Sequence, residues 1–369
     1  MSESLEQIKD TIIARERVST ESVAWLFSEG SDEELRTLSS LARRHYHADG
    51  VASYLKMAIV NYTNICVAKC DYCSFYRLPH AEGTYLLNQN QVFEKINALV
   101  SFGGTLVSFN GGFHPKLTIF DYAKLFKAVH LEYPSLKFYE MTVAEFMFTC
   151  KLSKVSYEEG AKILKDHGTE WITGGGAEIL VDSFRLRHSP GKYKVEDYYA
   201  AQKAILDQGL GSTATMVIGF DESTRERLEH LERLRRFQDE NQNRLASFLC
   251  WTYKPFGNVL GGKEVSTNEY LRWLAICRIY LDNFVHIRTS VLTKNERALE
   301  ALLWGANDFD LPTEDEVTQK AGATISHAFD TVLNHAEKIG IKAVYRKPFD
   351  TRVRPILSWQ PLAETTVPR

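Results

Sequence analysis

The spacing of apolar residues changes near residue 50. Before that point apolar positions recur at three- and four-residue steps, and Ser31 with Glu34 fits a capping box in front of one such run. From Met57 onward, short apolar runs alternate with longer amphipathic stretches. The pattern therefore predicts a helical segment over residues 1–50 that stops at Gly50, followed by a different architecture.

The short apolar runs predict strands, and the amphipathic stretches between them predict helices. We expect strands at 58–60, 105–109, 138–140, 170–172, 213–218, 247–251, 287–291 and 302–304. Helices are expected at 91–103, 120–133, 156–168, 195–209 and 223–240. Repeated strand–helix units form a parallel sheet, and six to eight of them indicate a full or partial (β/α) barrel.

The predicted fold class is α/β, a TIM-like (β/α) barrel with N-terminal helices and a C-terminal extension. We divide the chain into the helical segment 1–50, a barrel core at 51–285, and a region at 286–369 that completes the barrel and caps the substrate. The tail from about Pro348 is expected to be irregular.

Polar and glycine-rich residues follow the predicted strands, at the end where a parallel barrel carries its chemistry. In chain order they are Cys66 to Cys73, Asn110 to Gly112, Glu140, Gly174 to Glu178, and Gly219 to Glu222. We therefore expect a functional site at this rim.

Composition limits the partners. The 369 residues are 44% hydrophobic with a net charge of −3, which excludes a disordered chain and a basic field for nucleic acid. The first residues do not read as a secretory signal, and no run reaches the roughly 18 apolar residues of a membrane helix. We expect a cytoplasmic protein with reduced thiols and with neither a nucleic-acid nor a membrane partner.

Three of the six cysteines are clustered. Cys66, Cys70 and Cys73 form a C-x3-C-x2-C pattern, whereas the other three are scattered and fit small buried apolar residues. Three thiolates on one loop suit an iron–sulfur cluster and leave one iron open. Zinc, with His80 as a fourth ligand, and incidental cysteines are the alternatives.

With Tyr72 before its third cysteine, this segment resembles the signature of the radical S-adenosylmethionine (SAM) superfamily. The resemblance implies a [4Fe–4S] cluster on the three cysteines and SAM on the open iron, cleaved reductively to a 5′-deoxyadenosyl radical. It implies that Gly111 and Gly112 face the methionine part of SAM, where a side chain would block the approach. Further SAM contacts are implied for Tyr72, Phe75, Tyr76, Glu178 and Ile218.

Further segments resemble one branch of that superfamily, the cyclic dehypoxanthine futalosine synthases of menaquinone biosynthesis. The resemblance spans roughly residues 50–345 and is carried by 61–77, 174–182, 213–216, 229–240, 251–255, 269–284 and 305–309. The chain departs from the usual residues of the branch at Asn110, Phe220, Ser223 and Glu316.

The branch resemblance implies an intramolecular radical cyclisation of dehypoxanthine futalosine to its cyclic (spiro) form. The adenosyl radical takes a hydrogen atom from C4′ of the ribose, the carbon radical attacks the aryl ring, and an oxidation with loss of a proton restores aromaticity. Aminofutalosine synthase, the coenzyme F420 precursor synthase subunit and a divergent activity on another aryl substrate are the alternatives.

The implied partners are a small aromatic, nucleoside-like substrate and an electron donor such as flavodoxin or ferredoxin. The reaction needs a base near the ring and groups that hold the substrate. The candidate catalytic residues are Glu140, Asn307 and Asp308, which we expect at strand ends.

Overall fold

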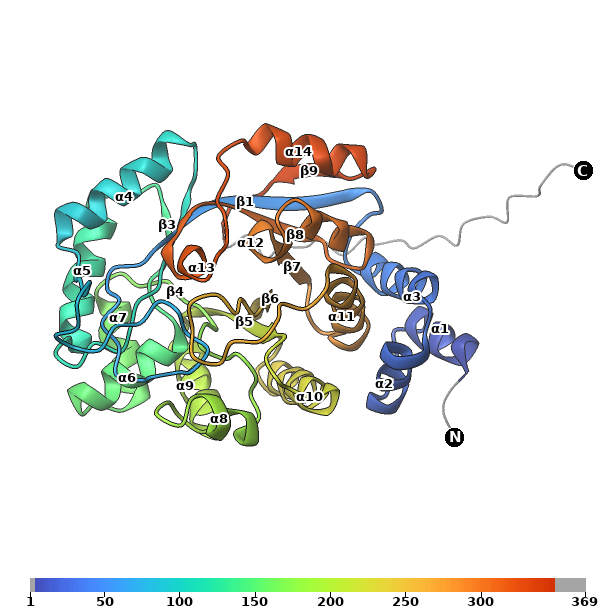
Figure 1. The fold of residues 1–369 in the computed structure, drawn as a ribbon, viewed down its shortest axis with the longest axis horizontal. Helices are drawn as coiled ribbons and strands as arrows, with labels where there is room; N and C mark the ends of the chain where they lie inside the picture. The colour runs from blue at the N-terminus through green and yellow to red at the C-terminus, as the bar shows by residue number, and fades with distance from the viewer. Residues whose placement is uncertain (1–3, 349–369) are drawn as a thin grey trace, which may run out of the picture.

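A computed structural model describes residues 4–348. Within that range nine parallel strands form one sheet in the order β3-β2-β1-β8-β7-β6-β5-β4, with β9 beside β1 (Figure 1). Their bounds are β1 Val51–Val60, β2 Leu106–Phe109, β3 Lys137–Tyr139, β4 Trp171–Ile172, β5 Gly211–Ile218, β6 Leu245–Thr252, β7 His286–Ser290, β8 Asp308–Asp315 and β9 Lys342–Tyr345.

The sheet curls into a nearly closed barrel, which confirms the predicted fold class. Its two end strands, β3 and β4, meet through a hydrogen bond of 3.0 Å from the Glu140 N–H to the Trp171 carbonyl and through a parallel bridge between Thr142 and Thr173. The seam is short because β3 and β4 have only three and two residues. The remaining pairs follow the parallel register expected from strand–helix repeats.

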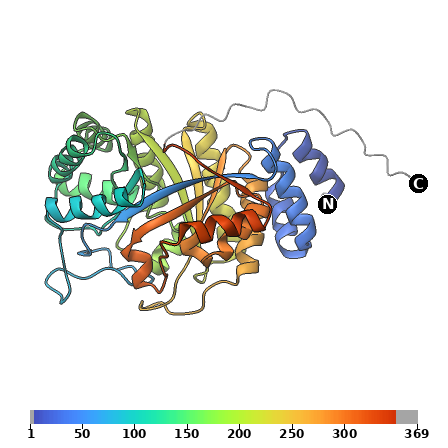
Figure 2. The ribbon, with the colours of Figure 1, turned by 90° about the horizontal axis from the view of Figure 1, so that it is seen from above.

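Helices cover the outside of the barrel (Figure 2). They are α4 Gln89–Ser101, α5 Ile119–Glu132, α6 Val143–Ser153, α7 Tyr157–Asp166, α8 Asp182–His188, α9 Val195–Asp207, α10 Thr224–Glu240 and α11 Thr267–Tyr280. Several begin at a capping box, such as Asn88 with Gln91 and Ser223 with Glu226. The core lies between their apolar faces and the strands.

Three N-terminal helices, α1 Leu5–Ile13, α2 Thr20–Glu29 and α3 Asp32–Arg44, pack beside α11 at one end of the molecule (Figures 1 and 2). The capping box at Ser31 is present as predicted. An ion pair of 2.6 Å joins Arg272 on α11 to Asp32 on α3. The N-terminal helices predicted ahead of the barrel are therefore present among the described residues.

The strand expected at 302–304 is wrong. Residues Arg297–Leu303 form a 3-10 helix, η1, after the short α12 (Val291–Lys294), and the eighth strand is β8. Pro312 and three aspartates obscured β8 in the sequence, because proline is usually excluded from central strands. A register shift in the pairing of β1 with β8, opposite Pro312, accommodates the proline.

The C-terminal part contributes strands and covering elements. β7 and β8 complete the barrel, α13 (Glu316–Lys320) follows β8, and α14 (Phe329–Lys338) leads to β9, which the sequence analysis did not predict. The expectation of an irregular tail falls on residues 349–369, outside the described range. No helix within residues 4–348 is both long enough and apolar enough to cross a membrane.

Candidate active site

A cavity of about 350 Å³ opens at the carboxyl end of the barrel and continues into its interior. At the rim it is lined by the loop after β1 and by the residues that follow β2 and β4. Deeper in the barrel it is lined by strand residues, among them Met57, Tyr139, Ser247, Arg288 and Asp310. The site therefore lies at the rim that the sequence predicted.

The three clustered cysteines, Cys66, Cys70 and Cys73, all line this cavity, and none is in a disulfide. Burial raises the pKa of each thiol, that of Cys73 to about 11. They therefore need a nearby positive charge, such as a metal centre, to become thiolates.

The donor set at this point of the cavity consists of three thiols from one loop. Among residues 4–348 no three His, Cys, Asp or Glu side chains gather closely enough for one metal ion. In an iron–sulfur cluster each thiolate binds a different iron, so its cysteines stand further apart than the ligands of one zinc ion. Cys66, Cys70 and Cys73 are the residues of the cavity wall that could hold such a cluster.

The glycine pair after β2 lets two loops approach closely. A Cβ atom on Gly112 would lie 2.3 Å from the Ile65 carbonyl oxygen and 2.7 Å from Cβ of Cys66. A Cβ atom on Gly111 would lie 2.6 Å from the ring of Tyr62. Gly111 lines the cavity, whereas Gly112 is buried outside the cavity wall and lies against the cysteine loop.

A buried charge cluster lies beside the cysteines. Glu178 contacts Lys192 at 3.0 Å and Arg185 at 3.6 Å, and Lys192 also donates to the hydroxyl of Tyr72 at 3.2 Å. Burial opposes the charge of Lys192, but the Glu178 carboxylate raises the pKa of the ammonium above its ordinary value. Two cations against one carboxylate leave a surplus positive charge, which suits an anionic ligand next to the cysteines.

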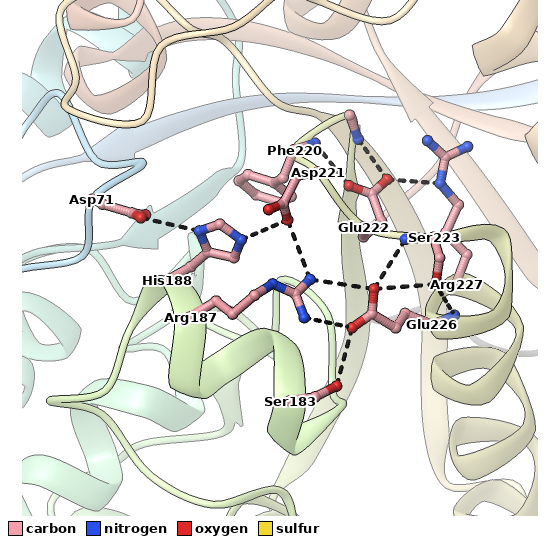
Figure 3. A network of polar contacts seen from close by, with 11 residues as sticks. Asp71, Ser183, Arg187, His188, Phe220, Asp221, Glu222, Ser223, Glu226 and Arg227 are labelled. Carbon is pink, nitrogen blue, oxygen red and sulfur yellow. Dashed lines mark hydrogen bonds and ion pairs between the residues drawn. The ribbon is translucent and has the colours of Figure 1, made fainter.

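A hydrogen-bond network ties the cysteine loop to the segment after β5 (Figure 3). The imidazole of His188, at the end of α8, contacts Asp71 at 3.0 Å and Asp221 at 2.7 Å. The carbonyl of His188 also accepts a hydrogen bond of 3.2 Å from the Asp71 N–H. Because Asp71 lies between Cys70 and Cys73, His188 helps to hold the loop that carries them.

Two of the four departures from the branch pattern lie in the cavity wall, whereas Ser223 caps α10 and Glu316 lies outside that wall. Asn110 and Phe220 line the cavity, and the Phe220 ring lies 5.2 Å from that of Tyr72 and 4.7 Å from that of Tyr253. Glu316 instead accepts a hydrogen bond of 2.7 Å from the Tyr85 hydroxyl. The aromatic side chain of Phe220 therefore lies in the cavity wall next to the cysteine loop.

The three candidate catalytic residues lie elsewhere. Among the described residues the cavity wall contains none of Glu140, Asn307 and Asp308. The misplaced eighth strand explains two of them, because Asn307 and Asp308 stand at the amino end of β8 rather than at its carboxyl end. The location expected for these two residues is therefore wrong.

Each of the three is held by structural contacts instead. Glu140 contacts His130 at 2.7 Å, and burial raises its carboxyl pKa to about 7. The Asn307 side chain accepts a hydrogen bond of 2.9 Å from the Ile287 N–H. Asp308 pairs with Arg288 at 2.8 Å and with Arg346 at 2.5 Å.

The remaining predicted residues divide between the cavity and the core. Phe75 lines the cavity with Tyr72 and Glu178, whereas Tyr76 is half-buried outside its wall. Ile218 packs in the core, and its neighbour Val217 lines the cavity, because successive side chains of a strand point to opposite faces.

Two residues of the cavity wall, Lys192 and Asp315, were missed by the sequence reasoning. The Ser-Pro-Gly-Lys run that carries Lys192 reads as an ordinary turn. Asp315 is the last residue of β8, the strand that the sequence analysis expected at residues 302–304.

Comparisons with known proteins agree with this geometry. Residues 60–234 match the model of the radical SAM superfamily, and residues 242–355 match that of the CofH/MqnC C-terminal region. Over 87% of both chains the protein is 34% identical to a cyclic dehypoxanthine futalosine synthase of Halalkalibacterium halodurans. It is 32% identical to an aminodeoxyfutalosine synthase of Thermus thermophilus, over 86% of each chain.

A solved structure shares the fold. The crystal structure of methylornithine synthase (PylB) aligns with a TM-score of 0.70 at 16% identity, covering 91% of this chain and 97% of that one. The three cysteines and the glycine pair fall within the superfamily match, and β7 and β8 within the C-terminal match. The chain belongs to the radical SAM superfamily, in the branch that carries the CofH/MqnC C-terminal region.

Proposed function

We propose that the protein cyclises dehypoxanthine futalosine in menaquinone biosynthesis. The observation that carries the proposal is the single cavity that joins Cys66, Cys70 and Cys73 at the rim to the barrel interior. Such a cavity holds a radical source and a substrate side by side and away from water. The identity to a cyclic dehypoxanthine futalosine synthase over most of both chains supports the choice of substrate.

In this proposal the three cysteines would hold a [4Fe–4S] cluster, and the glycine loop and the Glu178–Lys192 pair would hold SAM. When bound, the cluster and SAM supply a 5′-deoxyadenosyl radical that removes one hydrogen atom from the substrate. Gly111 leaves room for the methionine part of SAM, and Tyr72, Phe75 and Val217 form apolar parts of the cavity wall. A donor of the flavodoxin or ferredoxin class provides the electron.

The deeper half of the cavity is the place for the substrate. Its wall combines aromatic side chains, Tyr139 and Trp251, with the buried guanidinium of Arg288. Aromatic faces suit an aryl ring, and hydrogen-bond donors fix the orientation of its polar groups.

The experiment is anaerobic reconstitution followed by incubation with dithionite, SAM and dehypoxanthine futalosine. We expect 5′-deoxyadenosine together with a product that has two hydrogens fewer than the substrate, one lost as an atom and one as a proton. The Cys70→Ala variant should form neither, while Cys150→Ala should form both. SAM cleavage with an unchanged substrate would assign the chain to another aryl substrate, and a colourless protein with one zinc ion would overturn the cluster.

A further inference from the structure

Four carboxyl groups line the cavity, and two of them face cations. Glu178 contacts Lys192 at 3.0 Å, and Asp310 pairs with the guanidinium of Arg288. Each of these two carboxylates is held in an ion pair, and breaking a buried pair leaves an uncompensated charge. The other two are Glu145 and Asp315.

Glu145 has its accepting positions filled. One oxygen accepts hydrogen bonds from the Tyr62 hydroxyl and, at 2.8 Å, from the Gly111 N–H. The other accepts from the N–H and the hydroxyl of Thr142, at 3.1 and 2.7 Å. A carboxylate offers about four accepting positions, so Glu145 serves to fix the glycine loop.

Asp315 has accepting capacity left. It lies at the carboxyl end of β8, is 2% exposed, and accepts from the Val317 N–H at 3.2 Å and the Thr318 hydroxyl at 2.7 Å. Within residues 4–348 it has no ion pair. The backbone of Thr318 also bonds to this carboxylate, so about one of its accepting positions remains for a ligand in the cavity.

The surroundings of Asp315 keep it basic. Burial raises its pKa to about 7, and the charge of Glu314 adds to this. The nearby charged groups are occupied, since Glu314 pairs with Lys95 of α4 and Glu316 accepts from Tyr85. On β1, the residue paired with Asp315 is the apolar Ile59. Near neutral pH this carboxyl can therefore both hold and release a proton.

We propose that Asp315 is the base that accepts the proton lost by the aryl ring after cyclisation. This inference rests on the proposed function. The C4′ radical forms the new carbon–carbon bond to a ring carbon that carries hydrogen. The ring radical then gives one electron to a carrier of the ferredoxin or flavodoxin class, and its C–H bond breaks as the proton passes to the Asp315 carboxylate. The electron pair of that bond stays in the ring and restores aromaticity.

The test compares two products of the same reaction, 5′-deoxyadenosine and the cyclised compound. In Asp315→Asn we expect 5′-deoxyadenosine to form within about threefold of wild type, while the ratio of cyclised compound to 5′-deoxyadenosine falls about 100-fold. The matched control is Glu316→Gln, a neighbouring carboxyl already bound to Tyr85, which should keep the ratio. Iron content and thermal midpoint should be unchanged in both.

A second measurement needs no variant. In the wild-type protein the ratio should rise as pH increases through about 7, because Asp315 then becomes an acceptor. A ratio that stays flat between about pH 6 and 8, or a folded Asp315→Asn protein with the wild-type ratio, would overturn the proposal. If wild type forms 5′-deoxyadenosine but no cyclised compound at any pH, the proposed function itself fails, and the inference falls with it.

Discussion

Replacing Gly112 by alanine tests how the glycine loop holds the cysteine loop. The added Cβ would lie 2.3 Å from the Ile65 carbonyl oxygen, whereas real Cβ contacts are essentially never under 3.0 Å. The two loops must therefore separate by at least about 0.7 Å, the difference between those distances. Overpacking of this kind costs about 1–3 kcal/mol in stability.

The displacement falls on the residue before Cys66, so it should reach the chemistry. A misplacement approaching 1 Å near reacting atoms costs on the order of 100-fold in rate. We expect Gly112→Ala to lose iron during anaerobic reconstitution and to cleave SAM about 100-fold more slowly. The measurements are iron and sulfide per chain, the rate of 5′-deoxyadenosine formation and the thermal midpoint.

The matched control is Gly104→Ala, at the opposite end of β2. There the new Cβ would meet the flexible end of the Leu99 side chain at 2.0 Å, far from the cysteines along the strand. This variant should lose stability but keep its iron and its rate per folded molecule. Gly112→Ala with wild-type iron content and SAM cleavage within twofold would refute the reasoning about the two loops.

Three further predictions concern the cysteine loop, its contact with His188, and the buried carboxyl of Glu140. Alanine at any of the three clustered cysteines should abolish the broad absorbance near ~400 nm in spectra taken after reconstitution. Alanine at any of the three scattered cysteines should leave this absorbance unchanged. The reverse result would refute the ligand assignment. His188→Gln should weaken the retention of iron on gel filtration by several-fold. The imidazole hydrogen-bonds to both Asp71 and Asp221, and losing these contacts costs about 1–3 kcal/mol. Arg187→Gln is the control, and equal retention of iron in the two variants would contradict the role of His188. Glu140→Gln should leave SAM cleavage unchanged but flatten the pH dependence of stability. The pKa of the Glu140 carboxyl is raised from 4.5 to about 7 in the folded protein. Its contribution to the free energy of unfolding is therefore complete below pH 4.5 and is lost as pH rises through 7. Thermal midpoints across that range that are identical in variant and wild type would refute this prediction.

The sequence predicted most of the barrel because its strands are short apolar runs between amphipathic helices. It failed at β8, where alternate aspartates and Pro312 hide a strand whose polar side chains point into the barrel. That error moved Asn307 and Asp308 from one end of the barrel to the other. Local periodicity cannot show that a polar strand is buried, because the partners that satisfy it lie on other strands.

The candidate site was predictable where a motif has a local pattern, as at Cys66, Cys70, Cys73 and the glycine pair. Contacts formed by tertiary structure were not predictable. Lys192 reaches Glu178 only because the turn after α8 folds back over the cysteine loop, where a Cβ on Gly191 would meet the Ala68 carbonyl at 2.7 Å. Strand alternation likewise places Val217 in the cavity wall, where Ile218 was expected.

Isotope transfer from the substrate tests the central claim most directly. Dehypoxanthine futalosine carrying deuterium at C4′ of its ribose is incubated anaerobically with the reconstituted protein, SAM and dithionite, and the 5′-deoxyadenosine is examined by mass spectrometry. The proposed reaction predicts one deuterium in 5′-deoxyadenosine for each molecule of cyclised compound. Cyclised compound that forms while the 5′-deoxyadenosine stays unlabelled would contradict it.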